Sequence, residues 1–185
     1  MKNTEYVDIY DRNKNKTGKK KIRLKDVLEE NEYILGIQLI ILNSNNEILI
    51  TKRSNTKKVL PGKWECNGGA IAAGETPIEG LEREISEELG IDLDINKIIF
   101  YKTVIDDEKH NIKDIFIYKD DIDISNLKFS DNEVSAAKYV SIDEYMNMFN
   151  IGEIVYNVNF NDEDYSQIMK MVWTKYKNIR SLWKE

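Results

Sequence analysis

Residues 69–91 have the sequence GAIAAGETPIEGLEREISEELGI, and this stretch decides the fold and the site that the chain can build. Its second half predicts a helix from Pro77 to Leu89. Thr76 is a natural N-cap, proline suits the first helical position, and Glu79 completes a capping box. Gly90 suits the left-handed residue that ends many helices. Local signals alone therefore fix both ends of this helix.

Three glutamates of this helix share one side of it. Residues advance by about 100° around a helix axis, so Glu84, Glu87 and Glu88 lie within about 100° of arc. Like charges at this spacing cost about 0.2–0.5 kcal/mol per pair. A divalent cation would reverse that penalty, and carboxylate oxygens are the ligands that Mg²⁺ prefers. An adjoining apolar arc predicts the face toward the core: Ile78, Leu81, Ile85 and Leu89.

An acidic helix is most simply a solvated surface, and the five glutamates between Glu79 and Glu88 alone would not exclude that interpretation. The spacing of the whole segment favours a site. It runs Gly69, five residues, Glu75, seven residues, Arg83-Glu84-Ile85, one residue, Glu87-Glu88, one residue, Gly90-Ile91. This pattern resembles the Nudix box at every fixed position. The flanking sequence extends the resemblance from about Tyr33 to Met148.

The resemblance implies a Mg²⁺-dependent hydrolase (Mn²⁺ is the alternative ion) that cleaves a phosphoanhydride bond. It implies the α/β/α sandwich of that family, an α/β fold with a mixed sheet, to which the apolar period of about 3.6 residues near the C-terminus adds a helix. Glu84, Glu87 and Glu88 correspond to the residues that bind metal or activate water, and the Gly69 carbonyl often joins the metal shell. Glu75 and Arg83 correspond to a structural pair that steadies the loop and the helix.

Four residues outside the box are further candidates. Nudix enzymes often use one more acidic residue downstream, and Glu133 is our candidate, with an exposed strand-end acid as the alternative. Arg53 and Lys57 could contact substrate phosphates, although solvated basic side chains explain them equally well. Trp64 could stack on a base, or pack beneath the site loop as most aromatic side chains do.

The rest of the chain predicts a single domain. We expect an N-terminal extension over residues 1–30, a Nudix core over residues 33–148 and a C-terminal helix over residues 160–184. The expected strands cover residues 6–10, 33–42, 47–52, 97–105, 114–118 and 133–140. Residues 24–30 and 142–148 suggest short helices, and residues 54–73 an irregular segment.

Composition limits the partners. The 185 residues carry a formal net charge of −6, which argues against a long nucleic acid as the partner. The basic run Lys19–Lys21 is most simply a solvated turn and helix start. The longest apolar stretch, Ile34–Leu42, is interrupted by Gln38 and is far shorter than the ~20 residues of a membrane span. The single cysteine, Cys66, fits a reducing cytosol, so we expect a cytoplasmic protein without membrane contact.

Two alternatives remain from the sequence. The segment Tyr6–Asp11 is similar to isopentenyl-diphosphate isomerase-like proteins of this fold, although Cys66 does not fall where their cysteine would. A non-catalytic nucleotide-binding module is the other, although none of the box carboxylates is lost. The substrate is expected to be a small diphosphate compound, most simply a nucleoside diphosphate linked to another moiety. Nucleoside triphosphates, dinucleoside polyphosphates, nucleotide sugars, ADP-ribose and dinucleotide cofactors all stay open, as does pairing of two copies through the C-terminal helix.

Overall fold

A computed structural model describes residues 5–129, 133–154, 163–164, 167–168 and 170–171 of the chain. In chain order the elements are β1 (Tyr6–Tyr10), β2 (Lys16–Ile22), β3 (Tyr33–Leu42), β4 (Ile48–Arg53), β5 (Trp64–Glu65), β6 (Asn67–Ala70), α1 (Pro77–Leu89), β7 (Ile99–Asp106), β8 (Asn111–Lys119), β9 (Val134–Val140) and α2 (Ile142–Asn150). Short 3₁₀ helices, η1 (Ile95–Lys97) and η2 (Ile124–Asn126), precede β7 and β9.

Strand β3 is the centre of a mixed sheet. It pairs antiparallel with β1, β4 and β6, and parallel with β8. Strand β2 extends the sheet beyond β1, β7 lies beside β8, and β5 and β9 both pair with β4. The predicted burial of β3 on both faces is confirmed, because nine of its ten residues are buried.

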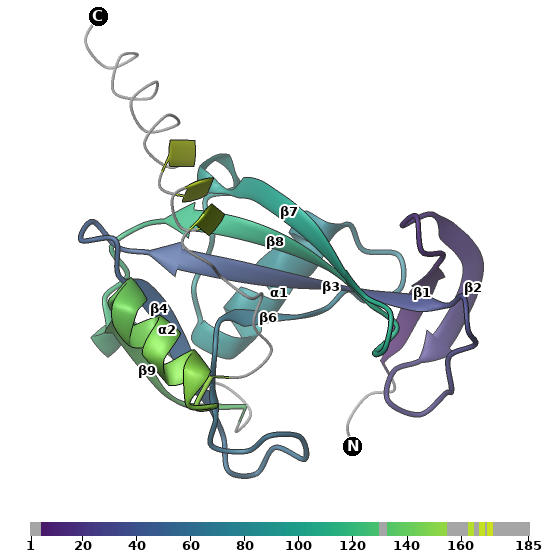
Figure 1. Cartoon of the computed structure of the whole chain (residues 1–185), viewed down its shortest axis with the longest axis horizontal. Coiled ribbons are helices and arrows are strands. Elements are labelled where there is room, and N and C mark those ends of the chain that lie inside the picture. Colours follow the sequence, from purple (N-terminus) through teal and green to yellow (C-terminus); the bar gives the residue numbers. More distant parts are fainter. Residues whose placement is uncertain (1–4, 130–132, 155–162, 165–166, 169, 172–185) are drawn as a thin grey trace, which may run out of the picture.

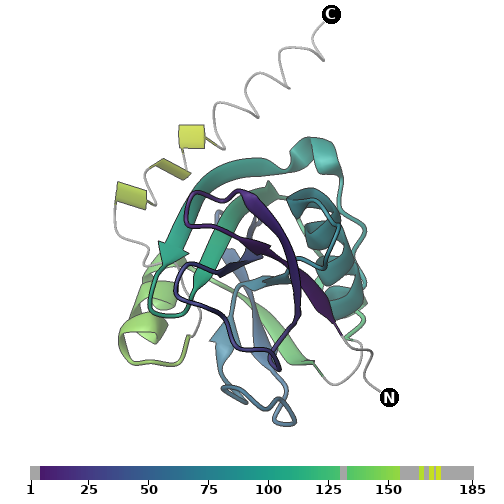
Figure 2. The ribbon, with the colours of Figure 1, turned by 90° about the vertical axis from the view of Figure 1, so that its right-hand side faces the viewer.

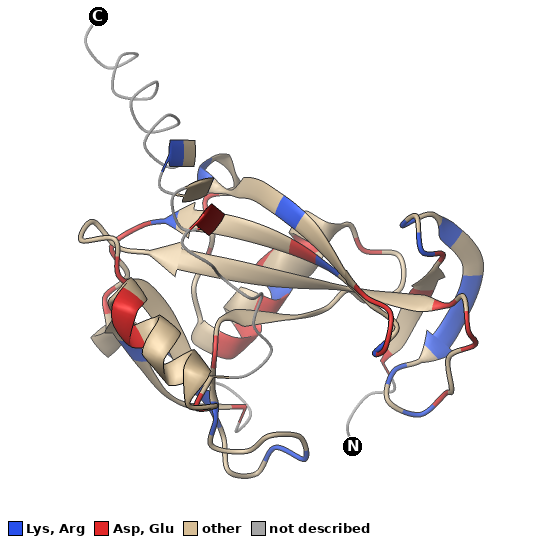
Figure 3. Cartoon of the chain, in the orientation of Figure 1, with Lys and Arg blue, Asp and Glu red and all other residues tan. Residues whose placement is uncertain are grey.

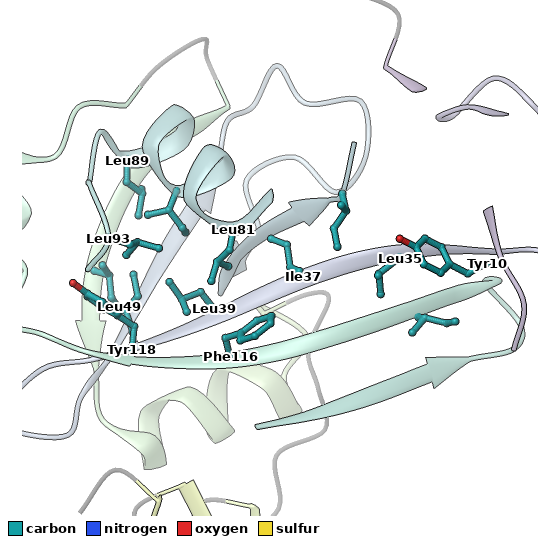
Figure 4. Packing of buried hydrophobic residues seen from close by; sticks show 14 of the residues in the cluster. Tyr10, Leu35, Ile37, Leu39, Leu49, Leu81, Leu89, Leu93, Phe116 and Tyr118 are labelled. Carbon is teal, nitrogen blue, oxygen red and sulfur yellow. The ribbon is translucent and has the colours of Figure 1, made fainter. Parts of the chain in front are cut away.

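The two helices cover opposite faces of this sheet (Figures 1 and 2). Alternate residues of β3 divide between them. Ile37 and Leu39 pack in the core beneath α1, together with Leu81 and Leu89 (Figure 4). Ile40 packs in the other core, which includes Tyr145 of α2. The architecture is thus the predicted α/β fold, with a mixed sheet between helical layers.

Three local expectations were wrong. Residues 24–30 form turns and loop instead of a helix, and the Lys19–Lys21 run lies in edge strand β2 instead of a turn. Figure 3 shows these lysines along that outer strand. The segment 54–73, expected to be irregular, contains β5 and β6. Short strands and lysine-rich edge strands take their structure from partners far away in sequence, which local patterns do not show.

Only part of the expected C-terminal helix lies within the described residues. Residues 163–164, 167–168 and 170–171 are helical. Ile168 is buried in the core on the α2 side, and Asp164 accepts hydrogen bonds from Tyr101 and Lys102 at 2.5 and 2.6 Å. Most of the residues expected in this helix lie outside the described residues. In the described part of the chain, no helix has the length and apolar character needed to cross a membrane.

Candidate active site

Helix α1 is held by its cap and its apolar face. The Thr76 hydroxyl accepts a hydrogen bond from the Glu79 backbone N–H, and the Glu79 carboxylate accepts one from the Thr76 N–H at 2.8 Å. Gly90 ends the helix with φ of 67°, in the left-handed region. Leu81, Ile85 and Leu89 are fully buried, at roughly 1.5–3 kcal/mol each. The helix is therefore a rigid support for its glutamates.

Gly69 brings strand β6 directly against the first of these carboxylates. Gly69 pairs with Ile37, so it faces the core beneath α1. A Cβ atom at Gly69 would lie within 2.5 Å of both carboxylate oxygens of Glu84. Only glycine lets the strand and the carboxylate approach this closely. Glu84 itself is 8% exposed, and burial raises the pKa of its carboxyl despite the opposing effect of Arg83.

Glu88 lies one turn further along α1 and is equally buried, with 8% of its surface exposed. Burial raises the pKa of its carboxyl to about 8, and the neighbouring carboxylates of Glu84 and Glu65 act in the same direction. Among the described residues, none donates a hydrogen bond to the Glu88 carboxylate, and none forms an ion pair with it. A buried carboxylate with neither is unusual and costly. The charge of Lys57 lowers the pKa of this carboxyl but does not offset its burial.

Glu75 and Arg83 form the expected loop–helix pair. Arg83 Nε and Nη2 donate to the two Glu75 carboxylate oxygens at 2.7 and 3.0 Å. Arg83 Nη2 also reaches the Ala70 carbonyl oxygen at 3.1 Å, and the Ala72 N–H donates to Glu75 at 2.9 Å. The pair therefore ties the loop after β6 to α1, which fixes how Glu84 faces Gly69.

Glu87 stands apart from its two neighbours. Its side chain is 62% exposed and meets Arg83 at 3.4 Å on the outer side of the helix. The expected stripe of three carboxylates is thus divided into two buried groups and one exposed group. In the described residues, no three acidic, histidine or cysteine side chains are already gathered as a metal-binding group. A shared ion would require Glu87 to turn inward, away from its contact with Arg83.

The basic candidates are engaged with acidic partners. Arg53 Nη1 donates to both carboxylate oxygens of Glu65 at 2.7 and 2.9 Å, and the rest of its guanidinium contacts the Val59 carbonyl oxygen. Its fork is therefore occupied, which favours a positioning role over phosphate contact. Lys57 Nζ lies 2.8 Å from the Glu133 carboxylate, and both charges act on Glu88. The structure thus brings Lys57 and Glu133 near Glu88, in the last turn of α1.

Trp64 lies on the other face of the sheet. It packs against the core on the α2 side, with Lys52 and Lys138 at 5.7 and 5.1 Å from its ring. This placement favours packing over base stacking next to the α1 carboxylates. Cys66 is buried on the same side, 3.5 Å from the Tyr145 hydroxyl, and burial raises the pKa of its thiol to about 11. Such a thiol does not suit the cysteine chemistry of the isomerase alternative.

Two residues near the carboxylates were not recognised from the sequence. Glu65 is largely buried, and burial raises the pKa of its carboxyl against the opposing effect of Arg53. Asn67 is 1% exposed, and in the described part of the chain its amide nitrogen and oxygen have no hydrogen-bond partner. The signal was the alternation of residues 65, 67 and 69, which places all three on one face of a strand. An expectation of irregular structure there concealed it.

Comparison with known proteins now decides the family. The model of the NUDIX domain matches residues 32–157. The chain belongs to the Nudix family. An uncharacterised Nudix hydrolase of Listeria monocytogenes is 30% identical over 156 residues, which cover 82% of this chain and 88% of that protein. A nucleoside triphosphatase NudI of Enterobacter sp. strain 638 is 41% identical over 58 residues, which cover 31% of this chain and 41% of that protein.

The fold agrees with this assignment. A solved structure from Deinococcus radiodurans superimposes with a TM-score of 0.69 and 20% identity, covering 89% of this chain and 98% of that one. At this identity the likeness shows the fold alone. As a Nudix hydrolase, this chain is an enzyme that acts on phosphorus-containing acid anhydrides.

Proposed function

We propose that this Nudix hydrolase depends on Mg²⁺ and cleaves the diphosphate linkage of a nucleoside diphosphate joined to another moiety. Glu84, Glu87, Glu88 and the Gly69 carbonyl would hold the metal, and Glu133 would complete the catalytic set. One observation carries the proposal: Glu84 and Glu88 are both 8% exposed on one helix face, and Glu84 lies against glycine backbone.

The residues present fit a divalent cation. Burial raises the pKa of the carboxyls of Glu84, Glu88 and Glu65 together, so the site holds its acidic groups at an electrostatic cost. Hard oxygen donors are the set that Mg²⁺ prefers, and Mn²⁺ accepts the same donors. The absence of a Cβ at Gly69 keeps backbone next to the Glu84 carboxylate. A bound Mg²⁺ would supply charge neutralisation and a more acidic water.

The chain's own groups orient the reaction. The Glu75–Arg83 pair fixes Glu84, because Arg83 Nη1 also donates to the Glu84 carboxylate at 2.9 Å. Burial raises the pKa of the carboxyls of Glu84 and Glu88, and a carboxylate of raised pKa is the stronger base toward a water proton once it is ionised. Lys57, beside Glu133, offers a positive charge that acts on Glu88 and that a substrate phosphate could share.

Substrate identity is tested with a panel. We would measure phosphate and nucleotide release from a nucleoside triphosphate, a dinucleoside polyphosphate, a nucleotide sugar, ADP-ribose and a dinucleotide cofactor. Each is assayed with Mg²⁺ and with EDTA. The triphosphate is included because a relative is a nucleoside triphosphatase. The other four compounds each join a nucleoside diphosphate to a different second group. We expect Mg²⁺-dependent turnover of at least one class.

Two matched variants decide whether the proposed site is responsible. Glu88→Gln removes a buried carboxylate, whereas Glu82→Gln makes the same change on the same helix, about 200° around the axis from Glu84. We expect Glu88→Gln to lose turnover by 10²-fold or more and Glu82→Gln to stay near wild type. Full activity in Glu88→Gln would remove Glu88 from the mechanism. Turnover that is insensitive to EDTA would refute metal dependence.

A further inference from the structure

Asn67 has a buried amide without a hydrogen bond to any described residue. Its side-chain nitrogen and oxygen both lack a partner there, and the residue is 1% exposed. Among the described residues, Gln38 is the other case. Leaving a buried amide unpaired costs stability, and an apolar side chain of the same size would avoid that cost. A purely structural role therefore does not explain an asparagine here.

Strand pairing places Asn67 beneath α1. Asn67 pairs with Leu39 and Gly69 pairs with Ile37, and both partners belong to the core under this helix. Asn67 and Gly69 therefore face the same side. The chain reverses after β6, so α1 runs back along the strand (Figures 1 and 4).

The charged neighbours of the two buried glutamates indicate which way α1 runs along the strand. Glu84 lies over Gly69 and responds to the charges of Arg23 and Glu5 near the far end of the strand. Glu88 responds to Glu65, at the near end. Asn67 is the residue between Glu65 and Gly69 on that face. It therefore lies under the helix turn that joins Glu84 to Glu88.

Asn67 thus lies on the strand face beneath α1, the helix that carries Glu88, and the two side chains are not hydrogen-bonded to each other in this structure. Among the described residues nothing donates to the Glu88 carboxylate, and the Asn67 amide donates to nothing. We propose that Asn67 is a positioning residue, whose Nδ2 donates a hydrogen bond to the Glu88 carboxylate when that side chain turns to bind the metal. The inference rests on the proposed metal site and adds to it a residue outside the Nudix box.

The test is metal affinity, measured apart from activity. Mn²⁺ is titrated into wild type and Asn67→Leu, with free Mn²⁺ followed by electron paramagnetic resonance. Partners that orient metal ligands typically change affinity by about 10- to 100-fold. We expect Asn67→Leu to raise the Mn²⁺ Kd at least about 10-fold while its Tm stays equal or rises. A merely structural asparagine would instead lower the Tm and leave the Kd alone.

Gln38→Leu is the matched control. Gln38 is 3% exposed and equally unpartnered, but it pairs with Gly68 and faces the α2 side. We expect its Kd to equal that of wild type. Asn67→Ala serves as a second variant if leucine prevents folding, with the same expected loss of affinity.

The outcomes separate the two ideas. A folded Asn67→Leu or Asn67→Ala protein whose Kd stays within twofold of wild type overturns the role of Asn67 and leaves the metal site intact. An equal loss in Gln38→Leu overturns it as well, because the effect would then be general. A wild-type protein that binds no Mn²⁺ overturns the proposed metal site itself.

Discussion

Replacing Gly69 with alanine tests how closely the strand must approach Glu84. The new Cβ would lie within 2.5 Å of both carboxylate oxygens, whereas ordinary contact begins at about 3.5 Å. The carboxylate must therefore move by about 1 Å. Because it is the end of a flexible side chain, the fold can absorb this movement. The site cannot, since a misplacement of about 1 Å can cost 10²-fold in rate.

The expected effects on stability and on rate are thus different. Gly69 has no left-handed φ, so alanine adds no backbone strain and gains about 0.4–1 kcal/mol through the unfolded state. Local repacking costs about 1–3 kcal/mol, which leaves a net loss of about 0–2.6 kcal/mol, near 1.3 kcal/mol at its midpoint. For a chain of this size, the midpoint lowers Tm by roughly 3–5 °C. We expect kcat/KM on the best substrate of the panel to fall about 100-fold.

Gly18→Ala is the control for lost stability. Gly18 lies in exposed strand β2 with φ of 83°, and a Cβ there would meet nothing within 4 Å. Left-handed strain costs about 1–2 kcal/mol, similar to the cost at Gly69. We expect its kcat/KM to be unchanged. A Gly69→Ala enzyme with wild-type activity, or a Gly18→Ala enzyme with an equal loss, would refute the argument from close approach.

The buried Glu88 carboxyl, the Thr76 cap and the Cys66 thiol each give a further prediction. Folding raises the pKa of the Glu88 carboxyl from 4.5 to about 8. The contribution of the protonated carboxyl to stability is therefore full below pH 4.5 and is lost as pH rises through 8. The free energy of unfolding falls by at most about 5 kcal/mol over this range. In EDTA, the Tm of wild type should therefore be lower at pH 9 than at pH 6, and this difference should be much smaller in Glu88→Gln. An equal Tm difference in the two proteins would contradict the burial of this charge. Thr76→Ala removes the capping box and should cost about 1 kcal/mol in urea unfolding with turnover unchanged, whereas a loss of turnover would mean that the cap shapes the site. The buried Cys66 thiol, with a pKa of about 11, should resist a disulfide reagent until urea unfolds the chain, and rapid labelling of the native protein would contradict its burial.

The part of the site that the sequence predicts is the part defined by local chemistry. Helix α1 begins and ends where its cap residues indicate, because N-caps and left-handed C-caps act within one turn of the chain. The Glu75–Arg83 pair also bridges only eight residues, and its ion pair is present at 2.7 Å. Strand β3 was equally clear, since a long run of branched apolar residues has few other uses.

What the sequence could not predict depends on pairing between distant segments. Strands β5 and β6 have two and four residues, and they exist because β4 and β3 supply their hydrogen bonds. Without those strands, nothing places Glu65 and Asn67 on the face of Gly69. The exposure of Glu87 could not be predicted either. Helix spacing gives the angle of this residue around the axis, but it does not give the position of the sheet that buries Glu84 and Glu88.

The unfavourable features of this chain are concentrated in one place, and this is an argument for function that does not depend on the motif. Glu84 and Glu88 are buried carboxylates on one helix turn, and Asn67, on the strand face beneath α1, has a buried amide that no described residue pairs with. Sequences depart from good packing and pairing mainly at functional sites, where the cost is offset by a rigid surrounding structure. Here the capped helix, its buried leucines and the Arg83 pair supply that rigidity. Gln38 is the exception on the opposite face, and for that reason its substitution separates a cost of burial from a contribution to the site.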